Sequence, residues 1–109
     1  MVGSGPAIVL PAWWVSHVAE DWQFDPLRRF VEGLAAGRMV VRYDRAGTGM
    51  SDRERSPQTF TPEFEAATLS AVLDELGLAR MTLMGVSCGG CTAVSFAAKH
   101  PERVDRLVL

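Results

Sequence analysis

Short apolar runs alternate with amphipathic segments along this chain of 109 residues. Four runs are mostly apolar, and the first, residues 7–10, is wholly so, as is typical of strands buried on both faces of a sheet. They cover residues 7–10, 39–43, 81–84 and 104–109. The segments between them predict helices, so the pattern indicates an α/β fold with three layers and a mainly parallel sheet. We expect the strands in the spatial order second, first, third, fourth.

Three amphipathic segments supply the predicted helices. The first begins at Asp25-Pro26, an N-cap followed by a first-turn proline, and ends near Gly37. The second begins at residues 61–63 and ends near residue 77, and the third runs to about residue 99. The core-facing positions predicted for the first two are Leu27, Phe30, Val31 and Leu34, and Phe64, Leu69, Val72, Leu73 and Leu76.

Residues 85–89, Gly-Val-Ser-Cys-Gly, lie between the third strand and the third helix. This order of strand, glycine-flanked serine and helix is the nucleophile elbow pattern G-x-S-x-G. A sharp turn exposes the serine hydroxyl, and the crowded backbone there needs small neighbours. The helix that follows directs its free N–H groups at the position of a developing oxyanion. The pattern predicts that Ser87 is a nucleophile at the carboxyl edge of the sheet, where such folds gather their chemistry.

Several separated motifs occur in the order found in the α/β-hydrolase fold. Residues 5–10 are similar to the family's approach to its third strand, and residues 43–52 resemble the D-x-R-G-x-G-x-S loop after its fourth strand. Residues 85–90 resemble the elbow, and residues 100–104 resemble the link to the sixth strand. The resemblance covers nearly the whole chain and points to the serine-nucleophile branch. Around Trp13 and Asp44 the chain looks most like the hydrolase-like domains found beside bacterial transcriptional regulators and nucleotide cyclases.

The resemblance implies a hydrolase that acts on an ester or similar small-molecule carbonyl substrate through an acyl-enzyme. Ser87 would attack, and the backbone N–H groups of Cys88 and Trp13 would hold the oxyanion. Serine in place of aspartate at position 87 speaks against the dehalogenase and epoxide-hydrolase branches. No metal and no organic cofactor is implied. The alternative is a non-catalytic ligand-sensing or regulatory domain that keeps the fold.

Two departures from the family pattern affect this interpretation. Pro11-Ala12 stand where the family often has His-Gly, although a backbone donor tolerates a change of side chain. Ala46 stands where the family commonly has the arginine of D-x-R-G, and Arg45 either compensates or the loop lacks that ion pairing.

The chain lacks a base for Ser87. On this fold the acid and then the histidine follow the serine in chain order. His100 lies about 12 residues along the helix, or roughly 18 Å at 1.5 Å per residue, and His17 precedes the serine. The resemblance implies that two early strands precede residue 1 and that the acid and histidine follow residue 109. Residues 1–109 are thus interpreted as a partial α/β-hydrolase domain, inactive as this segment.

Other candidate residues have structural explanations as well. We expect His17 to be a loop residue, His100 to end a helix, and Asp44 to anchor its loop. Trp13 and Trp14 either cover a substrate pocket or form buried wall, and the sequence leaves this open. Cys88 and Cys91 form a C-x-x-C at a helix start, which is also the pattern of a redox dithiol. The surrounding motifs favour reduced thiols, with Cys88 at the oxyanion hole and Cys91 in the packing.

Composition narrows the range of partners. The chain is 48% hydrophobic and 22% charged, with a formal net charge of −2, which gives no sign of binding to nucleic acid. Its apolar runs are too short to span a bilayer, and its start lacks the basic residues of a signal peptide, so we expect a cytoplasmic protein without membrane contact. Sheet edges at residues 39–43 and 104–109 are apolar and predict self-association.

Overall fold

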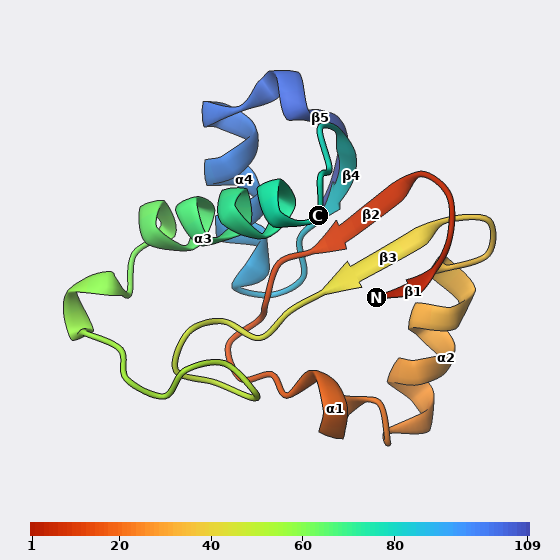
Figure 1. Ribbon diagram of the computed structural model, residues 1–109, viewed down its shortest axis with the longest axis horizontal. Coiled ribbons are helices and arrows are strands. Elements are labelled where there is room, and N and C mark those ends of the chain that lie inside the picture. Colours follow the sequence, from red (N-terminus) through yellow and green to blue (C-terminus); the bar gives the residue numbers. More distant parts are fainter.

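A five-stranded sheet lies between two layers of helices in the computed structural model, which describes residues 1–109 (Figure 1). The strands are β1 (Val2–Gly3), β2 (Ala7–Leu10), β3 (Met39–Arg42), β4 (Met81–Met84) and β5 (Val104–Val108). Their order in the sheet is β1-β3-β2-β4-β5, and the last four are parallel to one another. The predicted α/β class and strand order are therefore confirmed, and β2, β3 and β4 end at one carboxyl edge.

The helices divide between the two faces of the sheet. They are α1 (Val18–Asp21), α2 (Asp25–Leu34), α3 (Pro62–Glu75) and α4 (Gly89–Lys99), with 3-10 turns at Pro57–Thr59 and Pro101–Arg103. Side chains of β2 alternate between the faces. Val9 packs in the larger core with Leu69 of α3 and Phe96 of α4, whereas Ile8 packs with Val31 of α2. The sheet is thus covered on both sides, which explains why its central strands β2, β3 and β4 are mostly apolar.

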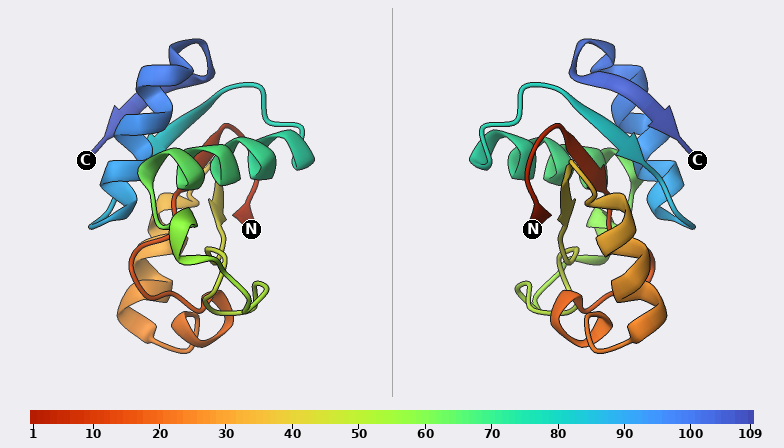
Figure 2. Two further views of the ribbon diagram at one scale, coloured as in Figure 1. Left: turned by 90° about the vertical axis from the view of Figure 1, so that its left-hand side faces the viewer. Right: turned by 90° about the vertical axis from the view of Figure 1, so that its right-hand side faces the viewer.

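The two edges of the sheet differ from the prediction. β1 pairs antiparallel with β3, through Val2 with Val40 and Gly3 with Met39, and so covers part of the edge expected to be exposed (Figure 2). The short β1 was missed because two residues leave no periodic signal. The opposite edge at β5 is open as expected, and Leu107 and Val108 remain 41% and 43% exposed.

Some helix details also differ. The N-cap of α2 is Phe24 instead of Asp25, which lies in the first turn and pairs with Arg28. Phe30 and Phe64 were expected in the core but are 42% and 37% exposed. Phe64 instead lies under the Arg55 guanidinium, whose carbon is 5.3 Å from the ring centre. Aromatic rings near a helix start are large enough to meet such partners outside the core. None of the helices is both long and apolar enough to cross a membrane.

Candidate active site

Ser87 occupies the turn between β4 and α4 and is exposed. Its φ is +54°, and it is the one non-glycine residue of the chain with a positive φ. A serine in this left-handed region is strained, and surrounding structure has to hold it there. The glycines beside it leave no room for larger residues, because a Cβ on Gly85 would lie 2.6 Å from the Cα of Gly90. The local geometry is therefore that of a nucleophile elbow.

The loop after β2 packs directly against the start of α4. A Cβ on Gly89 would lie 2.7 Å from the carbonyl oxygen of Pro11, so the two backbones touch. The backbone N–H groups of Trp13 and Cys88 donate to no acceptor in the chain. An oxyanion hole needs two such donors from these two segments.

Ser87 faces an open groove of about 620 Å³. Pro62, Val94 and Leu109 contribute to its walls, and Glu63 is its single charged residue. Cys91 lines the groove as well and is exposed, so the expectation that it packs in the interior is wrong. No histidine lines the groove. The described residues thus provide space beside the serine but no imidazole to take its proton.

Both histidines make contacts outside the lining of this groove. His17 is the N-cap of α1, where its Nδ1 accepts a hydrogen bond from the N–H of Glu20 at 3.2 Å. His100 ends α4, with its ring 4.9 Å from the ring of Phe96 and its Nδ1 3.6 Å from the carboxylate of Glu102. As expected, His17 lies in a loop and His100 ends a helix.

Asp44 anchors the two loops that follow β2 and β3. Its buried carboxylate accepts hydrogen bonds from Ser16 Oγ at 2.9 Å, from the N–H of Val18 at 3.0 Å and from the N–H of Met50 at 3.0 Å. A Cβ on Gly49 would collide with this carboxylate, which explains glycine in the loop motif. The expectation of a structural role for Asp44 is confirmed.

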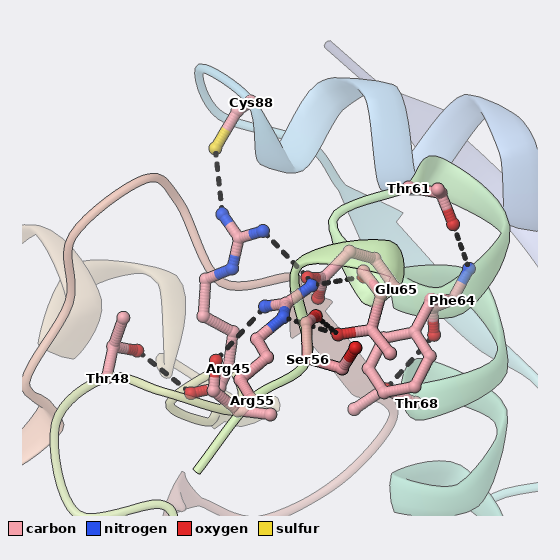
Figure 3. Close-up of polar contacts among 11 residues, drawn as sticks. Arg45, Thr48, Arg55, Ser56, Thr61, Phe64, Glu65, Thr68 and Cys88 are labelled. Atoms are coloured by element: carbon pink, nitrogen blue, oxygen red, sulfur yellow. Dashed lines mark hydrogen bonds and ion pairs between the residues drawn. The ribbon is translucent and has the colours of Figure 1, made fainter. Parts of the chain in front are cut away.

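Three charged side chains form a buried cluster beside the elbow, hereafter the Arg45 cluster: Arg45, Arg55 and Glu65 (Figure 3). Their side chains are only 10%, 3% and 10% exposed. Arg45 Nη2 and Arg55 Nη2 both donate to Glu65 Oε1, at 2.7 and 2.5 Å. Arg45 Nη1 also points at Cys88 Sγ from 3.9 Å. Arg45 therefore links the loop after β3 to the elbow. Its ion pair with Glu65 also shows that this loop has ion pairing although Ala46 stands where the family commonly has arginine.

Glu65 and Arg55 were missed as site residues by the sequence analysis. The available signal was a glutamate one helical turn before Leu69, on the face of α3 that the structure buries. Arg55 gave no comparable signal, since it is one of several charged residues in a polar loop. Its role depends on a fold that brings residue 55 to residue 65.

A small cavity of about 130 Å³ lies at the Arg45 cluster. Ala12, Trp14, Phe60 and Cys88 contribute to its lining along with Arg45. The structure places the two tryptophans differently, a distinction that the sequence left open. Trp14 is 69% exposed beside this cavity, whereas Trp13 packs on the α2 side of the sheet under the Arg42 guanidinium, 4.8 Å from its ring centre.

Tyr43 is the one group whose titration is clearly altered. Burial, and then the charge of Glu65, raise the pKa of Tyr43 well above its usual value, so the phenol stays neutral in the folded protein. No three His, Cys, Asp or Glu side chains come together in a way that could hold a metal ion.

Comparison with known proteins agrees with this geometry. The sequence family described as the alpha/beta hydrolase fold matches residues 10–109. The chain belongs to this family. It is 43% identical over 82 residues to the 2-hydroxy-6-oxononadienedioate/2-hydroxy-6-oxononatrienedioate hydrolase of Burkholderia vietnamiensis, covering 74% of this chain and 28% of that protein. It is 35% identical over 107 residues to the 2-hydroxymuconate semialdehyde hydrolase of Pseudomonas sp. strain CF600, covering 98% of this chain and 33% of that protein.

Solved structures of α/β hydrolases show the same fold. The enol-lactonase from Burkholderia xenovorans LB400 superposes with a TM-score of 0.78 at 31% identity, over 96% of this chain and 37% of the lactonase. The chain thus spans less than two fifths of the length of each of these proteins.

Proposed function

We propose that Ser87 is the nucleophile of a serine hydrolase that transfers an acyl group from an ester or similar carbonyl compound to water. The observation that carries this proposal is the positive φ of Ser87, held in a turn whose glycines exclude larger side chains. Backbone strain of this kind persists at functional sites when the surroundings impose it. The free N–H groups of Trp13 and Cys88 on either side support it.

The proposed reaction follows from these positions. Ser87 Oγ attacks the carbonyl carbon, and the N–H groups of Cys88 and Trp13 stabilise the negative charge on its oxygen. Collapse of this intermediate expels the alcohol and leaves an acyl group on Ser87, which water then removes. The base that takes the serine proton and the acid that orients it are proposed to lie outside these 109 residues. By itself this segment would then be a poor ester hydrolase.

The relatives support small molecules as substrates. Their names describe hydrolases of a dioate, of a semialdehyde and of an enol lactone. We extend to this chain the shared feature, hydrolysis beside a carbonyl group, together with a soluble, cytoplasmic setting and reduced thiols at Cys88 and Cys91. The similarity to domains beside regulators and cyclases stays part of the proposal, since the same site could bind a carbonyl ligand without turning it over.

Labelling by a fluorophosphonate probe tests the role of Ser87 in the complete protein that contains these residues. The probe should react with Ser87, and Ser87→Ala should abolish labelling and lower short-chain ester turnover by roughly 10³-fold or more. Ser95→Ala is the matched control, because Ser95 lines the same groove but lies within α4. Labelling and turnover should survive in that variant.

Unchanged turnover in Ser87→Ala would contradict the proposal. An unlabelled Ser87 in a protein that still binds carbonyl ligands would indicate the ligand-sensing domain instead.

A further inference from the structure

The Arg45 cluster contains more positive than negative charge. Two guanidinium groups share one carboxylate oxygen, Glu65 Oε1. The Asp44 carboxylate does not balance them, because it accepts from Ser16, Val18 and Met50 and pairs with neither arginine. Burying a charge without a partner is costly, so an unbalanced buried cation calls for an anion.

Arg45, and not Arg55, is the group with unused hydrogen-bonding capacity. Arg55 donates from all three of its nitrogens to oxygens of Ala46, Thr59 and Glu65. A guanidinium has five N–H donors. Arg45 directs one to Glu65 and one to the weak acceptor Cys88 Sγ, and its buried Nε has no partner. The aromatic rings of Trp14 and Phe60, each 5.9 Å from the Arg45 guanidinium carbon, favour the cation but carry no net charge.

The cavity at Arg45 has the size of a small anionic group. Its volume of about 130 Å³ corresponds to about four water-sized groups, enough for a carboxylate and an adjoining methylene. It is also close to the reacting centre. Arg45 Nη1 is 3.9 Å from Cys88 Sγ, and the backbone then places the Cα of Ser87 at most about 11 Å from that nitrogen. A short acyl chain spans such a distance.

We propose that Arg45 binds the carboxylate of the substrate while its reacting carbonyl lies at Ser87, so that the enzyme prefers short acyl groups that end in a carboxylate. This proposal rests on the proposed function, of which it specifies the substrate class. Trp14 and Phe60 line the cavity that would hold the carboxylate. Glu65 accepts a hydrogen bond from Arg45 Nη2 and so orients the guanidinium (Figure 3).

Two esters of equal acyl length test this preference in the complete protein. p-Nitrophenyl hydrogen glutarate ends in a carboxylate, and p-nitrophenyl pentanoate ends in a methyl group. We expect a higher kcat/KM for the glutarate, and Arg45→Gln should lower the ratio of the two kcat/KM values at least tenfold, mainly through the KM of the glutarate. Arg45→Lys should restore part of the ratio, since it keeps the charge but loses the planar fork.

Arg80→Gln is the matched control, since Arg80 is exposed, pairs with Asp105 and belongs neither to the Arg45 cluster nor to its cavity. It should leave the ratio and both activities unchanged. If Arg45→Gln lowered kcat/KM equally for both esters, or if the wild type did not prefer the glutarate, the proposal of a carboxylate subsite would be wrong.

Binding without turnover separates this proposal from the proposed function. Calorimetry on Ser87→Ala should show saturable binding of glutarate that weakens with added salt. In the same background, Arg45→Gln should abolish this binding and Arg45→Lys should keep part of it. Such binding in a protein whose Ser87 is never labelled would leave the subsite standing and overturn the hydrolase. Labelling of Ser87 without this binding would overturn the subsite alone.

Discussion

The two sides of the elbow at the carboxyl edge hold different kinds of structure. On the α4 side, Ser87 lies in an open groove among small and apolar residues, and its setting is defined by backbone contacts. On the side of the loop after β3, the Arg45 cluster is buried, charged and joined by side-chain hydrogen bonds. The first side presents a reactive atom, and the second presents a fixed charge.

This difference shows how the sequence encodes the strained turn at Ser87 and the fixed charge of the Arg45 cluster. The strained turn depends on five consecutive residues and on glycines that let two backbones touch. The charged side depends on residues 45, 55 and 65, which come from a loop and a helix and meet only in the folded chain. Substitutions on the two sides should therefore fail for different reasons, sterics on the one and unpaired charge on the other.

The largest effect on stability is expected at Glu65. Glu65→Gln leaves two buried guanidiniums without a negative partner, and loss of one member of a buried ion pair costs about 3–5 kcal/mol in the free energy of unfolding. Urea unfolding followed by circular dichroism measures this. Added glutarate should return part of the lost stability, because an anion that binds the folded state stabilises it.

Asp105→Asn provides the control for this variant. Its pair with Arg80 is 48–61% exposed, and surface pairs contribute at most about 1 kcal/mol. Equal losses in the two variants would contradict the distinction between a buried charged side and an ordinary surface.

A smaller, steric effect is expected at Gly89. Gly89→Ala places a Cβ 2.7 Å from the Pro11 carbonyl oxygen, so the loop that carries Trp13 has to move. Such overpacking lowers the free energy of unfolding by about 1–3 kcal/mol. Displacement of an oxyanion donor should raise the activation free energy of fluorophosphonate labelling at Ser87 by more than this loss. Labelling rates and urea midpoints measured on the same samples provide this comparison.

Gly33→Ala is the matched control on α2, where an added Cβ meets nothing within 4 Å. Alanine in a helix interior should raise the free energy of unfolding by about 0.5–1 kcal/mol and leave labelling unchanged. A labelling rate that is unaffected in Gly89→Ala would show that the contact between the loop and the elbow is not required.

Much of the fold could be predicted from the sequence, for reasons visible in particular residues. The apolar runs of β2, β3 and β4 are local signals, so the class, the order of the parallel strands and the position of Ser87 were all anticipated. The exposed Phe30 and Phe64 were not, since periodicity shows which side chains share a helix face but not how wide a stripe the sheet covers. β1 was missed because its two residues pair only through the distant β3.

The candidate site divides in the same way. The elbow follows from adjacent residues, whereas the Arg45 cluster requires a contact between residues 20 positions apart in sequence. A charged residue on the buried side of a predicted helix, such as Glu65, is the kind of local conflict that points to a polar partner elsewhere.

The smallest expected effect concerns Tyr43, the only tyrosine of the chain, whose titration is affected by the charges of the Arg45 cluster. Because burial and Glu65 raise the pKa of Tyr43, the folded protein keeps the phenol proton to higher pH than the unfolded chain does. Stability present at neutral pH should therefore be lost above about pH 10, by up to about 1.4 kcal/mol per pH unit. Unfolding curves between pH 8 and pH 11 measure this slope, and tyrosinate absorbance follows the same residue directly. Tyr43→Phe should flatten the slope that belongs to the phenol, and Glu65→Gln should move the absorbance change to lower pH by removing a neighbouring negative charge. A titration that is unaltered in Glu65→Gln would place the Arg45 cluster too far from Tyr43 to act on it.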